Sequence, residues 1–150
     1  MPPNENIVGL DDSPSGEAAL RWAAQHALTA GSQLRAIHIL DWQYNLSSAT
    51  PGLDITPLTV DEIDSSYRTS ITKVFKQIAP RADWSLEFVR GEPGPVLVRE
   101  STGAQLLVVG TRQHVGLGRL LVSSISHYCL SHATCPLVAV PAEAFSTTIV

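Results

Sequence analysis

Two short segments of this sequence combine glycine with polar or charged side chains directly after an apolar run. In the first, residues 9–13 read Gly-Leu-Asp-Asp-Ser and place two carboxylates side by side. The second runs from Gly110 to Ser124 and holds Arg112 and Arg119 among glycines and hydroxyl side chains. Guanidinium groups pair with phosphate, and glycine lets phosphate oxygens approach backbone N–H groups closely. The two segments therefore predict one shared ligand crevice.

Three common phosphate-binding classes do not fit these segments. A dinucleotide-binding turn needs Gly-x-Gly-x-x-Gly after its first strand, but here two carboxylates stand where a pyrophosphate would lie. A Walker A loop needs a lysine, and the lysines of this chain, Lys73 and Lys76, fall inside a predicted helix. A phosphorylation receiver also has an acidic pair, but its switch needs a lysine after the fifth strand, which this sequence lacks. Dehydrogenase, P-loop and receiver functions are therefore disfavoured.

Metal-binding and nucleophilic sites are also disfavoured. His127, Cys129, His132 and Cys135 have the ligand types of a zinc site. At about 100° per residue, however, His127 and Cys129 point to opposite sides of one helix. Ser124 and His127 lack the orienting carboxylate that a nucleophile and base require. We therefore predict no metal ligands and no catalytic residues, and we interpret both cysteines as small buried side chains.

Two alternatives remain open at other polar positions. Asp11 and Asp12 either contact a ligand or only open the helix that follows, where negative charge is favourable. His38 lies within an apolar run, so we interpret it as a hydrogen-bonded core histidine rather than a ligand.

The elements that must position these residues alternate along the chain. Ser13 and Pro14 are a typical helix start, and Gly31 is a typical stop, which predicts a helix over residues 14–30. Residues 42–58 have no period and predict a long surface loop. Strands are predicted at residues 6–10, 34–40, 84–90, 106–110 and 136–141, with 84–90 at a sheet edge. Further helices are predicted from the capping box at 59–62 to Pro80, in a short segment ending at Glu100, and along a face formed by Leu121, Ile125, Cys129 and His132.

Strict alternation of strands and helices predicts a doubly wound α/β fold with a five-stranded parallel sheet. In such folds, ligands bind at the carboxyl ends of the strands where the strand order reverses. The first and fourth strands should flank that point, which brings the two polar segments together. We see no internal repeat and predict a single domain over residues 1–150, with a core of about 6–141 and a C-terminal tail at 142–150.

Composition limits the setting in which this chain works. The chain has 150 residues, is 44% hydrophobic and carries a formal net charge of −4, so nucleic acid and anionic membranes are disfavoured as partners. No apolar run approaches the roughly 20 residues of a membrane span. The N-terminus lacks the pattern of a signal peptide, and there are only two cysteines. We therefore expect a cytoplasmic protein.

Six fragments, in this order and spacing, resemble the universal stress protein family. The resemblance spans about residues 6–141 and implies a flavodoxin-like sheet of order 3-2-1-4-5. It also implies a small stress-response binding module, an adenine nucleotide such as ATP or AMP as ligand, and a homodimer through the last strand, Pro136 to Val140. The fragments are Ile7 to Pro14, Ile37 to Ile39, Gly91 to Pro93, Leu107 to Gly110, Gly110 to Arg112 with Ser124 to Ser126, and Cys135 to Val140.

The resemblance also assigns the site residues. Nucleotide-binding members carry G-x2-G-x9-G-[ST] after the fourth strand, and here Gln113 and Ser123 replace two of the glycines. By resemblance, Asp11 contacts the sugar and base region, while Ile39 and Val109 flank adenine. The triphosphate half of the site is therefore more altered than the adenosine half. The candidate nucleotide-binding residues are Gly9, Leu10, Asp11, Ile39, Val109, Gly110, Arg112, Gln113, Gly116, Ser123, Ser124 and Ile125.

Two other functions stay open beside nucleotide binding. The first is a nucleotide-free interaction protein that acts through its dimer surface, because Gln113 and Ser123 could obstruct the phosphate track. The second is slow ATP hydrolysis, for which only the acidic pair Asp11 and Asp12 offers support. We therefore expect a binding module that is not an enzyme and requires no cofactor.

Overall fold

The computed structural model describes residues 4–40, 60–79, 81–111 and 124–145. These residues form five strands and four α-helices, followed by the short 3₁₀ helix η2 (Ala142–Phe145). The strands are β1 (Glu5–Gly9), β2 (Gln33–Leu40), β3 (Ser85–Arg90), β4 (Leu106–Thr111) and β5 (Leu137–Pro141). The α-helices are α1 (Pro14–Ala30), α3 (Val60–Ile78), α4 (Pro93–Glu100) and α5 (Ser124–His132).

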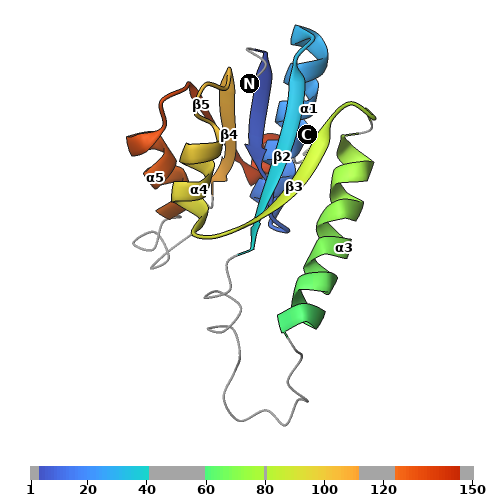
Figure 1. Cartoon of the computed structure of the whole chain (residues 1–150). Coiled ribbons are helices and arrows are strands. Elements are labelled where there is room, and N and C mark those ends of the chain that lie inside the picture. Colours follow the sequence, from blue (N-terminus) through green and yellow to red (C-terminus); the bar gives the residue numbers. More distant parts are fainter. Residues whose placement is uncertain (1–3, 41–59, 80, 112–123, 146–150) are drawn as a thin grey trace.

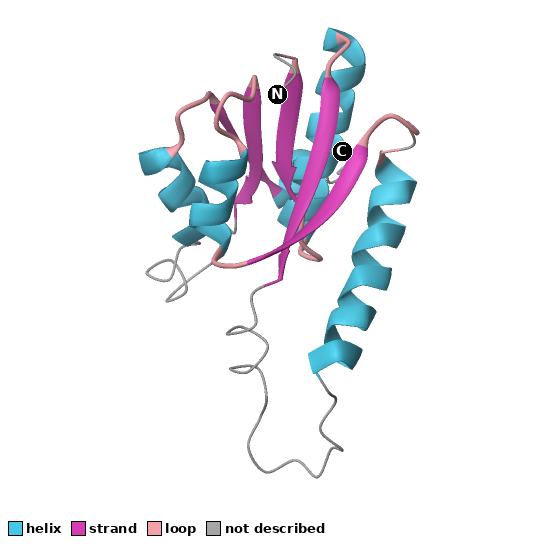
Figure 2. Ribbon diagram, viewed as in Figure 1, coloured by secondary structure: helices cyan, strands magenta, loops and turns pink. Residues whose placement is uncertain are grey.

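The five strands form one parallel sheet of order β3-β2-β1-β4-β5, which confirms the predicted topology (Figure 1). Helices α1 and α3 lie on one face of this sheet, and α4 and α5 lie on the other (Figure 2). The strand order reverses between β1 and β4, which are neighbours in the sheet. The carboxyl ends of these two strands therefore border the crevice position of a doubly wound fold.

Helix α1 follows the local signals of its sequence. The Ser13 side chain accepts a hydrogen bond from the Gly16 N–H at 3.0 Å, and Pro14 occupies the first turn. At the other end, Gly31 adopts a left-handed conformation with φ of 67° and donates its N–H to the Ala27 carbonyl. Alanines such as Ala23 and Ala27 are buried and let α1 lie close to the sheet. Both predicted ends of this helix are confirmed.

The core has two apolar layers because the central strands are buried on both faces. In β1, Val8 packs in the layer beneath α1 and α3, whereas Ile7 packs in the layer beneath α4 and α5. Both side chains are fully buried. Continuous apolar runs, rather than alternating ones, are typical of such strands. The outer strand β3 is only partly buried, which confirms its prediction as an edge strand.

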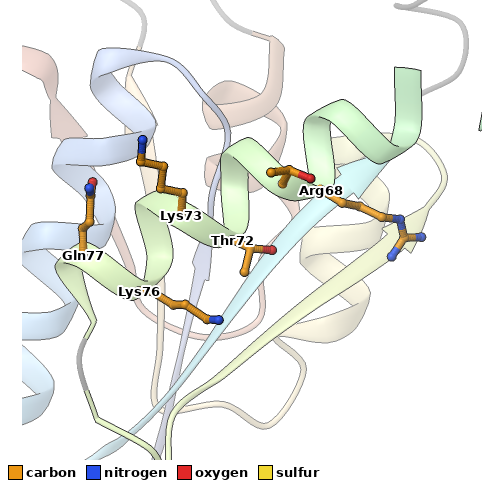
Figure 3. A pocket seen from close by; sticks show the side chains of 6 residues that line it. Arg68, Thr72, Lys73, Lys76 and Gln77 are labelled. Atoms are coloured by element: carbon orange, nitrogen blue, oxygen red, sulfur yellow. The ribbon is translucent and has the colours of Figure 1, made fainter. Parts of the chain in front are cut away.

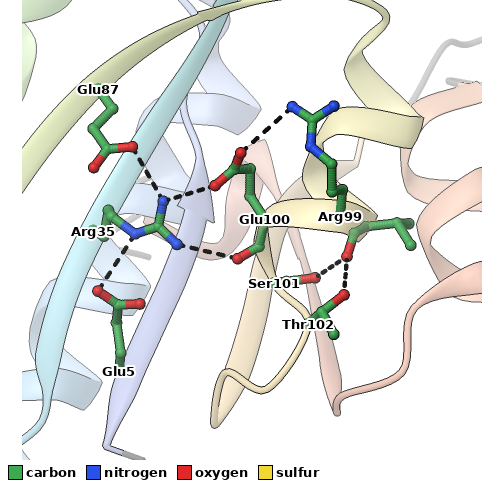
Figure 4. Close-up of polar contacts among 8 residues, drawn as sticks. Glu5, Arg35, Glu87, Arg99, Glu100, Ser101 and Thr102 are labelled. Atoms are coloured by element: carbon green, nitrogen blue, oxygen red, sulfur yellow. Dashed lines mark hydrogen bonds and ion pairs between the residues drawn. The ribbon is translucent and has the colours of Figure 1, made fainter. Parts of the chain in front are cut away.

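A cluster of charged side chains connects strands β1, β2 and β3 to the carboxyl end of α4 (Figure 4). Arg35 on β2 forms ion pairs with Glu5 at 3.4 Å, Glu87 at 3.1 Å and Glu100 at 3.1 Å. It also donates to the Glu100 carbonyl oxygen at 3.1 Å. Burial alone would lower the pKa of Arg35, but the hydrogen bond to Glu100 and the charges of Glu5 and Glu87 raise it above its usual value. Arg35, a charged residue within the otherwise apolar strand β2, therefore joins β1, β2, β3 and α4.

Several predicted boundaries shift by one or two residues. Strand β1 begins at Glu5 and ends at Gly9, because pairing with β2 stops at Gly9 and Ile37. Trp84 precedes β3 and is buried. His132 is exposed and stacks on Tyr128 with a centroid distance of 4.0 Å, so it does not continue the buried face of α5. The predicted loop at 42–58, the start of the capping box at 59 and Leu121 lie outside the described residues.

The C-terminal segment folds back onto the domain as far as it is described. Helix η2 packs against α1, and the Phe145 ring contacts the apolar layer on that side of the sheet. This contact joins residues 142–145 to the core of the same chain. No helix within residues 4–40, 60–79, 81–111 or 124–145 combines the length and the apolarity needed to cross a bilayer.

Candidate functional site

The ends of β1 and β4 meet at the first turn of α1. A Cβ atom added to Gly110 would lie 2.5 Å from both the carbonyl carbon and the carbonyl oxygen of Ser15. Ser15 is 5% exposed, so this contact is part of the packed interior. The predicted proximity of the two segments is therefore confirmed at the point where the second one begins. Glycine is required at position 110 because helix α1 approaches β4 closely, a reason that the sequence pattern alone did not reveal.

The Asp11 carboxylate folds back over the start of α1. Its Oδ1 atom accepts a hydrogen bond from the Ser13 N–H at 3.0 Å and another from the Ser13 hydroxyl. The Ser13 oxygen in turn accepts from the Gly16 N–H, so Asp11, Ser13 and Gly16 form a continuous relay. A Cβ on Gly16 would lie only 2.1 Å from Asp11 Oδ1. Asp11 thus fixes the β1–α1 turn, whereas Asp12 is exposed.

Three apolar candidate residues come together on the α4 and α5 side of the sheet. Val109 is 2% exposed, and Ile39 and Ile125 are partly buried against the same apolar cluster. Leu97 of α4 covers the backbone of Gly9, since a Cβ on that glycine would lie 3.0 Å from Leu97 Cδ1. The side chains expected to flank adenine therefore belong to one apolar layer below the strand ends.

The backbone of Leu10 contacts His38 on β2, a residue that the sequence identified only as part of the core. His38 is 8% exposed, and its Nδ1 atom lies 2.7 Å from the Leu10 carbonyl oxygen. This contact confirms that His38 is a hydrogen-bonded core histidine. Its proximity to the crevice follows from the pairing of β1 with β2, which neither residue type nor spacing revealed.

The remaining candidates form the predicted phosphate-binding half of the site. Arg112, Gln113, Gly116 and Ser123 lie outside the described residues. Ser124 is the first residue of α5, and its backbone position alone is described. Their contact with a ligand stays a prediction.

The histidine and cysteine side chains near α5 point in different directions. His127 is exposed, whereas Cys129 is fully buried, as expected for residues on opposite sides of a helix. Burial raises the pKa of the Cys129 thiol to about 11, with a smaller contribution from Cys135. Both cysteines are free thiols. Within the described residues, no three His, Cys, Asp or Glu side chains are grouped so as to hold a metal ion.

A shallow hollow of about 580 Å³ lies on the outer surface of α3 (Figure 3). Its lining comes from this one helix, and none of the lining side chains is buried. The hollow is therefore solvated helix surface, distinct from the junction of β1, β4 and α1. The lining residues are Arg68, Thr69, Thr72, Lys73, Lys76 and Gln77.

The described geometry defines a doubly wound α/β protein with a ligand crevice position at its topological switch point. The sequence of this chain matches a family model, described as "Universal stress protein family", over residues 5–141. The chain belongs to the universal stress protein family.

Curated relatives include proteins of two different lengths. Universal stress protein Rv2005c of Mycobacterium tuberculosis is 31% identical over 132 residues, which cover 88% of this chain and 43% of the relative. Universal stress protein YxiE of Bacillus subtilis is 25% identical over 145 residues, covering 91% of this chain and 98% of the relative. The chain thus spans less than half the length of the mycobacterial relative and matches the Bacillus relative almost from end to end.

Solved structures show the same fold. Universal stress protein UspA from Lactobacillus plantarum superposes with a TM-score of 0.68 at 22% identity, covering 91% of this chain and 97% of the other. A universal stress protein in complex with cAMP gives 0.63 at 20% identity, covering 91% and 96%. One from Archaeoglobus fulgidus in complex with dAMP gives 0.61 at 18% identity, covering 91% and 97%.

Proposed function

We propose that this chain binds an adenine nucleotide at the crevice bordered by the β1–α1 turn and the end of β4. The observation that supports this proposal is the close approach of Gly110, the first residue of the second predicted segment, to Ser15 in the first turn of α1. Two solved relatives are complexes with cAMP and with dAMP, which supports an adenylate as ligand. The proposed role is that of a stress-response module in which an occupied crevice changes a partner contact.

The adenosine and first phosphate are the proposed determinants of affinity. Gln113 and Ser123 stand where nucleotide-binding relatives have glycine, so side chains would compete with the second and third phosphates for backbone N–H groups. Asp11, with its carboxylate fixed by Ser13, is the proposed contact to the sugar. AMP is therefore expected to bind more tightly than ATP.

Calorimetric titration with AMP, ATP and cAMP tests this proposal, with native mass spectrometry to detect nucleotide that is already bound. Asp11→Asn removes the charge and keeps an acceptor oxygen, and it should weaken AMP binding about tenfold or more. Asp12→Asn is the matched control, because the neighbouring carboxylate is exposed, and its affinity should equal that of the wild type. Absence of binding by the wild-type protein would refute the proposal.

A separate assay of ATP hydrolysis distinguishes a binding protein from a hydrolase. We propose binding without turnover, because the described Asp11 oxygen is occupied in shaping the turn. Incubation with ATP and Mg²⁺, followed by measurement of released phosphate, should give no rate above the buffer control. A rate that depends on Asp11 would instead support slow ATP hydrolysis.

A second proposed function is an interaction protein that works through the edge of β5. This strand is the last in the sheet, and Ala139 at its centre is exposed. An apolar edge strand can pair with its symmetry mate, so we propose a homodimer through residues 136–140.

The two free thiols agree with the proposed location in the cytoplasm, where cysteines stay reduced.

A further inference from the structure

Both backbone polar groups of Leu10 are bound to β2, although Leu10 lies beyond the last paired residue of β1. Its N–H donates to the Ile37 carbonyl at 2.9 Å, which continues the ladder by one bond. Its carbonyl lies 2.7 Å from His38 Nδ1, so a side chain takes the place of the next backbone donor. Leu10 is 2% exposed, so water does not compete for this carbonyl.

The chemistry of this contact assigns the proton on the imidazole. A carbonyl oxygen can only accept, so His38 Nδ1 must carry the hydrogen. The neutral ring is therefore the Nδ1–H tautomer, with a lone pair on Nε2. This assignment can be tested without any ligand.

Aromatic rings from two other elements hold the imidazole in place. Phe88, the register partner of His38 on β3, meets it edge-on with a centroid distance of 5.8 Å. Tyr67 of α3 stacks against it at 6.4 Å with an interplanar angle of 24°. The Arg68 guanidinium lies over the Phe88 ring at 4.7 Å. The orientation of the donor is thus set by α3 and β3 and not by the β1–α1 turn itself.

The Leu10 carbonyl belongs to the same planar peptide as the Asp11 N–H. A fixed carbonyl therefore fixes the direction in which the chain enters Asp11, whose carboxylate then binds Ser13 at 3.0 Å. We propose that His38 is a positioning residue of the crevice, which holds the Leu10–Asp11 peptide and thereby aims the Asp11 carboxylate at the ligand. This inference rests on the proposed adenine-nucleotide function.

Three variants separate the donor from the ring. His38→Leu removes the donor, and His38→Asn keeps an N–H close to the position of Nδ1. Phe88→Leu loosens the ring packing while leaving the donor in place. We expect His38→Leu to weaken AMP binding about tenfold and His38→Asn to stay within about threefold of the wild type. Phe88→Leu should give a loss between these two values, because the donor is present but its ring is less firmly held. Equal affinity of His38→Leu and the wild type would overturn the inference, as would an equal loss in His38→Asn.

Nuclear magnetic resonance gives a readout that does not depend on AMP. Long-range ¹H–¹⁵N spectra of the wild-type protein under mildly alkaline conditions should show His38 with a protonated Nδ1 and an unprotonated Nε2. The amide signals of Asp11 and Ser13 should shift in His38→Leu and return toward wild-type positions in His38→Asn. The opposite tautomer, or unchanged amide signals, would overturn the positioning role. If wild-type protein shows the expected tautomer and amide shifts yet does not bind AMP, the proposed function fails while the role of His38 in the turn stands.

Discussion

At the scale of single residues, two glycines of this chain illustrate two different reasons for lacking a side chain. Gly31 has a φ of 67° and nothing within 4 Å of the position of a Cβ, so its constraint is conformational. Gly110 carries no positive φ, and its constraint is the backbone of Ser15 at 2.5 Å. Sequence patterns identify the first kind readily, because a glycine after a helical period is a common stop. The second kind depends on a contact between segments almost a hundred residues apart.

These two constraints predict different outcomes for the same substitution. Gly31→Ala should lower the free energy of unfolding by about 1–2 kcal/mol, the cost of a left-handed residue with a side chain. Gly110→Ala should lower it by about 2–3 kcal/mol, because the clash is with backbone that cannot rotate away. Urea denaturation measures both values. AMP affinity should fall only in Gly110→Ala, since that change alone displaces the β1–α1 junction from β4. A normal affinity in a folded Gly110→Ala protein would show that this junction does not shape the crevice.

At the scale of elements, helix ends were more predictable than strand ends. Ser13, Pro14 and Gly31 act through their own backbone and neighbours, so α1 begins and ends where the sequence indicates. The ends of β1 depend instead on pairing with β2, where Glu5 lies opposite Gln33 and Gly9 opposite Ile37. No local property of Leu10 shows that the paired register of β1 ends one residue before it, although the Leu10 N–H still donates to the Ile37 carbonyl. The strand order was predictable from the alternation of elements together with the family resemblance.

Arg35 shows how a single polar position can join several elements. It connects β1, β2, β3 and the end of α4, and its side chain is only 12% exposed. Arg35→Met would leave three carboxylates without their shared cation. We expect a loss of about 2 kcal/mol in the free energy of unfolding, less than for a fully buried pair because Glu87 is half exposed. Arg35→Lys, which keeps the charge but has fewer donors, should lose less.

The pH dependence of this loss has a defined sign. Because the folded-state pKa of Arg35 is raised above its usual value, the contribution of Arg35 to stability is fully present at neutral pH and is lost only in strongly alkaline solution. The difference in the free energy of unfolding between wild type and Arg35→Met should therefore be constant around neutral pH. Denaturation curves at several pH values around neutrality measure this difference, and a steep change within that range would contradict the assigned role.

At the scale of the whole molecule, the sequence predicted which strand ends lie together better than it predicted the contacts that shape them. The carboxyl ends of β1 and β4 had to meet because the strand order reverses between them. Asp11 was correctly expected at that edge, and its bond to Ser13 shows that it shapes the turn, whereas its contact with a ligand stays a prediction. The supporting contact from His38 could not be predicted, because it joins β1 and β2 through a side chain that resembles an ordinary core histidine.

The sheet has two outer strands, and they differ in a way that bears on the proposed homodimer. On β3, the exposed positions are Ser85, Glu87 and Arg90, and Glu87 is paired with Arg35. Charged side chains of this kind discourage pairing between edges. On β5, the exposed position is Ala139, without charge on its neighbours Val138 and Val140. If one edge pairs with a second copy of the chain, these side chains favour β5.

A matched pair of lysine substitutions tests this choice of edge. Ala139→Lys places a charge at the centre of β5 and should convert the proposed dimer into a monomer, because the symmetry mate would bring a second lysine close to it. Ser85→Lys places the same charge on the exposed edge of β3 and should leave the dimer intact. Light scattering coupled to size exclusion at several protein concentrations measures the mass. A dimer that survives Ala139→Lys and dissociates in Ser85→Lys would move the interface to the opposite edge of the sheet, next to α3 and its lysines.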